Sequence, residues 1–334
     1  MSDEVNRRRI VADGRAIRGL SISHFGAHAL EPGPLTPLMK RGYMRYANVN
    51  GKCRWTTGAF VLLLALSSVA NEIVDDSFKS DALGHEYKFR VYLPDDYKDE
   101  RKSQFPVIYL LHGGGADEKW WTGRGGAEPT LNALIARGQI RSAIAVMPGN
   151  GSNWYFDSPT ERAERAIMEE LLPFIEAKYR VSKERSARII GGLSMGGAGA
   201  LNFALKYPEK FCAAMLLSPA IYDPLPPPKS SARKHAVFMK NGQFDPDIWK
   251  SHHYLSHLDA YQKKGQKVSF WIMSGDHDFL DIALLSTQLY ARLLPTQPKQ
   301  VELRIVDGDH ESMVWRDALP DALRYADEQC IRNR

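Results

Sequence analysis

The sequence predicts an α/β fold in which helices cover both faces of a mostly parallel central sheet. From residue 86 onward, short β-like runs alternate with helical runs, an order typical of parallel strands joined by covering helices. Several of these runs lack polar alternation, as expected of strands buried on both faces. In chain order, the predicted strands are YKFRVYL, PVIYLLH, SAIAVMP, ARIIGG, CAAMLLS, VSFWIMS and VELRIVD.

The clearest predicted helix lies within SPTERAERAIMEELLPFIEAKY, between the third and fourth predicted strands. Ile167, Leu171, Phe174 and Ile175 recur at helical spacing, so we expect this stripe to pack on the core. Pro173 has no amide proton to donate and should kink the helix.

One stretch departs from the regular alternation of strands and helices. Residues 221–245, IYDPLPPPKSSARKHAVFMKNGQFD, are rich in proline and polar side chains and show neither period. We expect a loop-rich, lid-like insertion at about residues 221–250 that crosses the sheet edge where the strands end. A segment of this kind is either a functional lid or a surface loop.

Composition and charge place the chain among globular proteins. It has 334 residues, of which 44% are apolar and 25% charged. The formal net charge of +5 resides in the first 70 residues, which hold 10 Lys and Arg against 4 Asp and Glu. Residues 71–334 hold 34 Lys and Arg against 35 Asp and Glu. Because nucleic-acid binding needs an excess of positive charge on the folded domain, this balance argues against a nucleic-acid partner.

The segment GAFVLLLALSSVA, residues 58–70, has the layout of a signal peptide. It is apolar or small throughout, follows Lys52 and Arg54, and ends in small residues that predict cleavage after Ala70. A transmembrane helix needs about 20 apolar residues, so we expect no stable membrane span after cleavage. An uncleaved membrane anchor is the alternative.

This pattern divides the chain into a leader, residues 1–70, and one folded domain, residues 71–334. A signal peptide does not usually have the 38 residues that precede Met39 here. We therefore hypothesise that translation starts at Met39 or Met44, which would give a basic segment of normal length before the apolar run. We expect the domain to be exported to the periplasm or the extracellular space.

Only two cysteines, Cys212 and Cys330, follow the predicted cleavage site. They could form one disulfide, but the sequence does not require it. Cys212 lies in the apolar run FCAAMLLS, where a buried free thiol is the expectation.

Ser194 stands at the centre of the strongest motif in the chain. Gly192-Leu193-Ser194-Met195-Gly196 fits the pattern G-x-S-x-G between a predicted strand and a predicted helix. Such a turn strains the serine backbone and projects its hydroxyl away from the sheet, and glycines on either side permit the close approach of strand and helix. Glycine-rich turns between a strand and a helix also bind phosphate. However, the turn matches neither of the two phosphate-binding patterns, G-x-x-x-x-G-K-[ST] and G-x-G-x-x-G. We therefore predict that Ser194 is a nucleophile.

A serine nucleophile needs a base and an orienting carboxylate, in the chain order Ser, Asp or Glu, His. The runs SGDHDFLD and DGDHES follow the last two predicted strands, and the ends of parallel strands converge on one crevice. We predict that His310 is the base and Asp278 the carboxylate, with Asp276 as its rival. We expect Asp307 and Asp309 to cap loops.

The same run offers an alternative, a metal-dependent hydrolase. The side chains of Asp276, His277, Asp278, Asp309 and His310 are of the types that bind metal ions. This alternative leaves the serine turn unexplained, and no paired ligands at helical spacing accompany the cluster. We therefore expect no metal and no other cofactor.

The glycine loop in YLLHGGGADEKWW should supply the oxyanion hole, the set of amides that stabilises a tetrahedral intermediate. His112-Gly113-Gly114-Gly115 follows a predicted buried strand, so its backbone can approach a substrate closely. We predict that the amides of Gly114 and Met195 form the hole, with Gly115 as the second choice.

Taken together, these motifs resemble the esterase D and feruloyl esterase group of α/β-hydrolases. The resemblance covers about residues 75–330 and is carried by YLLHGGG, VMPGNGSNWYFDSP, GGLSMGGAGAL, SGDHDFL and DGDHESMVWRDALPDAL. It implies an α/β-hydrolase fold and the same roles for Ser194, Asp278, His310, Gly114 and Met195. Ser312, where relatives often carry an aromatic residue, and the proline-rich insertion depart from the group.

We therefore expect a serine carboxylic ester hydrolase that acts on acylated sugars, aromatic feruloyl-type esters or other small esters. Its substrate would be a small molecule or an ester linked to carbohydrate. Aromatic side chains in predicted loops could line its binding site, namely Trp120, Trp121, Trp154 and Tyr222. An acyltransferase, a cytosolic S-formylglutathione hydrolase and a noncatalytic cell-surface binding module are the alternatives.

Overall fold

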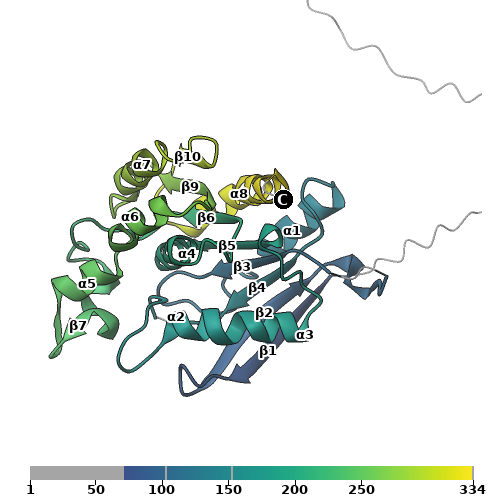
Figure 1. The fold of residues 1–334 in the computed structure, drawn as a ribbon, viewed down its shortest axis with the longest axis horizontal. Helices are drawn as coiled ribbons and strands as arrows, with labels where there is room; N and C mark the ends of the chain where they lie inside the picture. Colours follow the sequence, from purple (N-terminus) through teal and green to yellow (C-terminus); the bar gives the residue numbers. More distant parts are fainter. Residues whose placement is uncertain (1–70, 102–103, 152, 333–334) are drawn as a thin grey trace, which may run out of the picture. The chain divides into compact units, whose positions relative to one another are not determined.

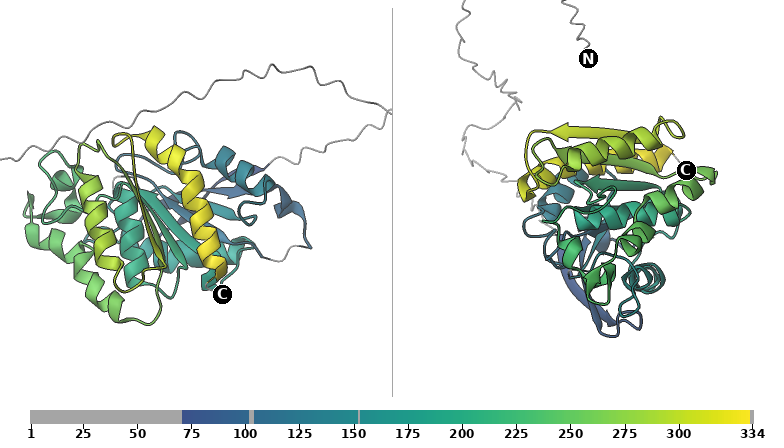
Figure 2. Two further views of the ribbon diagram at one scale, coloured as in Figure 1. Left: turned by 90° about the horizontal axis from the view of Figure 1, so that it is seen from above. Right: turned by 90° about the vertical axis from the view of Figure 1, so that its left-hand side faces the viewer.

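The computed structural model describes residues 71–101, 104–151 and 153–332; the predicted leader lies outside them. In this part of the chain, helices flank an eight-stranded sheet of order β1-β2-β4-β3-β5-β6-β9-β10 (Figures 1 and 2). Within this sheet, only the β1–β2 and β2–β4 pairs are antiparallel. The strands are β1 (Glu72–Lys79), β2 (Glu86–Leu93), β3 (Val107–Leu111), β4 (Ile144–Pro148), β5 (Arg188–Leu193), β6 (Ala213–Leu217), β9 (Ser269–Gly275) and β10 (Val301–Val306).

All seven predicted strands are present, and β1 is a strand that the sequence did not indicate. Its segment EIVDDSFK carries two adjacent carboxylates, which interrupt a β-like apolar pattern. The structure pairs each with a distant cation: Asp75 with Arg90 on β2, and Asp76 with Lys178. These partners make the polar positions compatible with an edge strand.

Strand β3 shows how the sheet is buried on both faces. Val107, Tyr109 and Leu111 pack into one hydrophobic cluster, whereas Ile108 and Leu110 pack into another on the opposite face. Figure 1 shows the helices around this sheet. Residues of α3 (Leu172–Lys178), α4 (Met195–Lys206) and α7 (Ile282–Leu293) belong to the first cluster; those of α1 (Ala127–Ala136) and α8 (Ser312–Arg332) belong to the second.

The predicted helix around Pro173 is divided into three pieces. α2 (Ala163–Arg165) leads into a π-helical turn at Ala166–Leu171, and α3 follows with Pro173 in its first turn. Proline cannot donate the hydrogen bond that would continue a regular helix, so the wider turn directly precedes it. Ile167 and Ile175 of the predicted stripe lie in the core.

The insertion at residues 221–250 is packed against the domain and contains short elements. Two 3-10 turns, Ser231–Lys234 and Ala236–Phe238, precede a hairpin of β7 (Met239–Lys240) and β8 (Gln243–Phe244). Helix α5 (Pro246–His252) begins at its end, and α6 (Leu255–Lys263) follows the insertion. The rings of Phe238, Trp249 and Trp154 meet edge to face, and the Trp249 indole donates a hydrogen bond to the Tyr222 carbonyl. This aromatic cluster anchors the insertion.

The expectation of a free thiol at Cys212 is wrong. Cys212, just before β6, forms a disulfide with Cys330 near the end of α8, with 5.2 Å between their Cα atoms. Helix α8 packs across β6, which brings its last turn back to the start of that strand. The sequence could not show this because 118 positions separate the two residues. Among the described residues, no helix has both the length and the apolar character needed to cross a bilayer.

The disulfide predicts a measurable stabilisation. Closing so long a loop restricts the unfolded chain, so reduction should lower the free energy of unfolding by about 3 kcal/mol. Urea unfolding with and without dithiothreitol measures this difference. The double variant Cys212→Ala/Cys330→Ala is the control and should not respond to the reductant; a wild-type protein equally stable in both conditions would contradict the prediction.

Candidate active site

Ser194 lies in a sharp turn between β5 and α4. Its backbone has φ 52° and ψ −118°, a conformation that side-chain-bearing residues rarely adopt. A Cβ atom on Gly192 would overlap the Gly196 carbonyl, and one on Gly196 would overlap the Leu111 and His112 carbonyls. Both glycines therefore allow the strand and helix backbones to meet at Ser194.

The structure brings Ser194, His310 and Asp278 together in one line of hydrogen bonds. His310 Nε2 lies 2.9 Å from Ser194 Oγ, and His310 Nδ1 lies 2.7 Å from Asp278 Oδ2. The Asp278 side chain is fully buried, and its other oxygen accepts a hydrogen bond from the Leu280 amide at 3.0 Å. With Nδ1 protonated towards the carboxylate, Nε2 can accept the serine proton.

Asp276, the rival carboxylate, is directed elsewhere. Its Oδ1 accepts hydrogen bonds from the Gly308 amide at 3.1 Å and from His277 Nδ1 at 2.7 Å. The hydrogen bond from the Gly308 amide lowers the pKa of Asp276, and the hydrogen bond from His277 lowers it further. Asp309 closes the neighbouring loop, since its Oδ1 accepts from the amides of Phe279 and His310.

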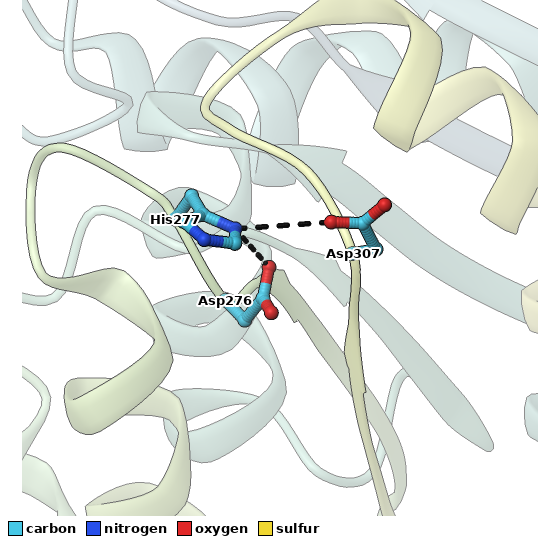
Figure 3. Close-up of side chains that lie close together, drawn as sticks. All are labelled: Asp276, His277 and Asp307. Carbon is cyan, nitrogen blue, oxygen red and sulfur yellow. Dashed lines mark hydrogen bonds and ion pairs between the residues drawn. The ribbon is translucent and has the colours of Figure 1, made fainter.

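The five residues considered as metal ligands fall into separate groups. Asp276 and His277, together with Asp307, place ligand atoms within 4.8 Å of one another on the exposed surface (Figure 3). Asp278 and His310 are not part of this group and bond to each other. The structure therefore does not gather the predicted ligand set around one point.

Gly114 and Met195, the predicted oxyanion-hole residues, both line the pocket that contains Ser194. A Cβ atom on Gly114 would lie 3.9 Å from Met195 Sδ, so the two residues are neighbours. Met195 begins α4, and the first amides of a helix have no intrahelical acceptor. Gly115, the second choice, has φ 74° and is outside the residues that line this pocket.

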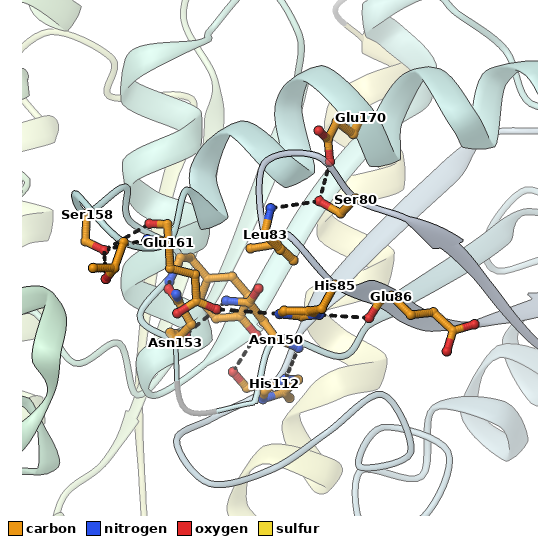
Figure 4. A network of polar contacts seen from close by, with 12 residues as sticks. Ser80, Leu83, His85, Glu86, His112, Asn150, Asn153, Ser158, Glu161 and Glu170 are labelled. Carbon is orange, nitrogen blue, oxygen red and sulfur yellow. Dashed lines mark hydrogen bonds and ion pairs between the residues drawn. The ribbon is translucent and has the colours of Figure 1, made fainter.

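His112 holds the glycine loop in place, a role that the sequence did not indicate. The side chain is buried; its Nδ1 donates to the Gly113 carbonyl at 2.8 Å, and its Nε2 accepts from the Asn150 amide at 2.9 Å. The Tyr155 hydroxyl donates to the His112 carbonyl at 3.1 Å (Figure 4 shows this surrounding network). Burial lowers the pKa of His112, which favours the neutral ring that this pattern needs.

A pocket of about 170 Å³ surrounds the Ser194 hydroxyl. Trp154 and Tyr222 line it, as predicted, together with Lys229 and Phe279, which the sequence did not single out. Burial raises the pKa of Tyr222 to about 12, so its hydroxyl stays protonated and can donate a hydrogen bond.

Trp120 and Trp121 do not line this pocket, contrary to the prediction. Trp121 is 1% exposed and packs in the cluster under α1 and α8. Trp120 packs edge to face on Trp121 and against Trp315. Both indoles follow the glycine loop in sequence, but the chain turns back there, which buries Trp121 in the core and packs the partly buried Trp120 against it.

Comparison with known proteins assigns the chain to a family. The model described as "Putative esterase" matches residues 80–326, which is more than half of the chain. The chain belongs to the esterase family. This confirms the resemblance found in the sequence.

This esterase-family chain is similar to proteins that also contain other regions. It is 31% identical over 192 residues to an endo-1,4-beta-xylanase/feruloyl esterase of Xylanibacter ruminicola, an alignment covering 53% of this chain and 26% of that protein. It is 35% identical over 145 residues to an esterase of Mycobacterium tuberculosis, covering 41% and 30% respectively. The chain thus spans less than a third of the length of these curated relatives.

Solved structures place the esterase-family chain in the α/β-hydrolase fold. A ferulic acid esterase superposes with a TM-score of 0.67 at 27% identity, covering 78% of this chain and 98% of that chain. The mostly parallel sheet between helices agrees with this comparison, so the predicted fold class is confirmed.

The glycine spacing around Ser194 can be tested by adding one methyl group. Gly196→Ala should lower the free energy of unfolding by about 1–3 kcal/mol, because its Cβ overlaps the carbonyls after β3. Gly265→Ala is the matched control, since a Cβ there meets no atom within 4 Å. Urea denaturation of both variants measures the difference, and equal stability of the two would contradict this account of the turn.

Proposed function

We propose that this chain is a serine carboxylic ester hydrolase that acts through an acyl-enzyme. The observation that carries the proposal is the hydrogen-bonded line from Ser194 through His310 to the buried carboxylate of Asp278. Membership of the esterase family supports it independently. In this proposal, Ser194 is the nucleophile, His310 the general base and acid, and Asp278 the orienting carboxylate.

The geometry suits a two-step reaction. Ser194 Oγ attacks the acyl carbonyl carbon while His310 Nε2 takes the hydroxyl proton. Collapse of the tetrahedral intermediate breaks the bond to the alcohol oxygen, which takes that proton from His310 and leaves the acyl-enzyme. Water then attacks the same carbonyl while His310 accepts its proton. Collapse of this second intermediate breaks the bond to Ser194 Oγ, which takes the proton back from His310 as the acid leaves.

Two groups stabilise the charges that develop. Asp278 accepts from His310 Nδ1 throughout, which holds the ring tautomer and stabilises the imidazolium. The amides of Gly114 and Met195 would donate to the oxyanion, and the N-terminus of α4 adds its positive end. His112 supports this arrangement by fixing the glycine loop.

We propose acylated sugars, feruloyl-type aromatic esters or other small esters as substrates. The name of the Xylanibacter relative and that of the superposed ferulic acid esterase support this class. The pocket beside Ser194 is compatible with an aromatic acyl group, because Trp154, Tyr222 and Phe279 line it.

The domain organisation and the location belong to the same proposal. Residues 1–70 would be the leader, residues 71–334 the exported catalytic domain, and residues 221–250 a lid-like wall of its site. The disulfide between Cys212 and Cys330 supports export, because such bonds persist chiefly in oxidising compartments.

Removing the nucleophile should abolish activity without unfolding the domain. Ser194→Ala should lower kcat for p-nitrophenyl acetate at least about a thousandfold and should prevent labelling by a fluorophosphonate. Intact-mass analysis and peptide mapping locate the label, which we expect on Ser194 of the wild type. Ser251→Ala, at an exposed position of α5, is the control. Retained turnover, or an adduct at another serine, would refute the assignment.

The two neighbouring carboxylates should differ sharply in their effect on rate. Asp278→Asn removes the acceptor for His310 Nδ1 and should lower kcat by about 10³- to 10⁴-fold. Asp276→Asn should change kcat only a few-fold, because that side chain bonds to Gly308 and His277. Thermal unfolding of both variants checks that each is folded. Equal losses of kcat would contradict the role given to Asp278.

A further inference from the structure

A second cavity, of about 430 Å³, lies at the edge of the sheet that carries Ser194. Small-molecule sites typically have volumes of about 300–1,000 Å³. Most of the residues that line it have polar or charged side chains, and they include His85 and Glu161, which face each other in Figure 4. The remaining walls come from β2, the glycine loop after β3, the loop after β4 and the insertion.

The polar cavity and the Ser194 pocket are lined in part by the same three chain segments. Three segments each place one residue in the pocket and another in the cavity, a few positions apart in sequence. One ligand could therefore extend from the serine into the polar cavity. The residue pairs, with the Ser194 pocket first, are Gly114 and Asp117, Trp154 and Asn153, and Ser231 and His235.

Carboxylates dominate the chemistry of the cavity. Glu86, Asp117, Glu118 and Glu161 line it against one lysine, Lys88. Among the described residues, none donates a hydrogen bond to the half-buried Glu118 carboxylate, and Glu161 Oε1 lies 4.0 Å from His85 Nε2. Ionised carboxylates only accept hydrogen bonds, so they suit a ligand with several hydroxyl donors and disfavour an anion.

The cavity also offers donors to such a ligand. His235 Nδ1 accepts a hydrogen bond from the Val237 amide at 3.3 Å, and burial lowers the pKa of this histidine. A neutral ring with Nδ1 as acceptor carries its proton on Nε2, which can donate. This histidine and Lys88 can therefore donate hydrogen bonds to ligand oxygens that have no proton of their own.

We propose that this cavity binds a neutral sugar, the alcohol part of the ester whose acyl carbonyl lies at Ser194. The proposal rests on the proposed function and names the leaving group of that reaction. Hydrogen bonds to the sugar hydroxyls hold the ester across the shared segments, and binding energy from this non-reacting part of the substrate promotes the reaction at the serine.

The test compares esters that share one acyl group, the one cleaved fastest in a p-nitrophenyl series. The substrates are the methyl ester, the 5-O-acyl ester of arabinose and the 6-O-acyl ester of glucose. We expect kcat/KM for at least one sugar ester to exceed that of the methyl ester about tenfold or more. The variant Glu118→Gln/Glu161→Gln should lose about tenfold on that sugar ester and less than twofold on the methyl ester.

Glu209→Gln is the matched control, because this exposed carboxylate follows α4 at the opposite edge of the sheet. It should leave both substrates unchanged. Turnover of the methyl ester with no preference for either sugar ester, or equal losses on both ester types in the double variant, would overturn the sugar site and leave the hydrolase intact. Absence of turnover for every p-nitrophenyl ester would overturn the proposed function, and the sugar site with it.

Discussion

The close approach of β5 and α4 at Ser194 is the constraint on which the rest of the site depends. The serine backbone is held at positive φ by the strand on one side and the helix on the other. Only glycine fits at positions 192 and 196, where a side chain would overlap a backbone carbonyl. The strain is tolerated because β5 lies in the middle of the sheet, hydrogen-bonded on both sides.

The other groups are positioned relative to this turn by contacts within the loops that follow the neighbouring strands. Asp278 and His310 follow β9 and β10, and Asp309 ties these two loops together through the Phe279 and His310 amides. On the opposite side of Ser194, His112 links the glycine loop after β3 to the loop after β4. The loops that carry the catalytic carboxylate, the histidine and the glycines are thus each fixed by hydrogen bonds to a neighbouring loop.

The insertion decides what can approach the serine. Its aromatic anchor, Phe238 and Trp249 against Trp154, fixes a wall that faces two cavities of different character. Trp154, Tyr222 and Phe279 line the one at Ser194, where we propose the acyl group, and four carboxylates line the other, where we propose the sugar. A substrate with an apolar acid and a polar alcohol matches this division.

The sequence by itself predicted the seven strands β2 to β6, β9 and β10 of the sheet, the serine turn and the histidine, because these depend on local pattern and on the convergence of parallel strand ends. It favoured Asp278 but kept Asp276 as a rival, and it assigned both Trp120 and Trp121 to the site, since nearby residues share the same local signal. Only the tertiary structure placed Asp278 against His310, packed the two indoles in and against the core, and joined Cys212 to Cys330. Those outcomes depend on how loops fold back and how α8 crosses the sheet, and contacts between residues far apart in sequence leave no periodic signal.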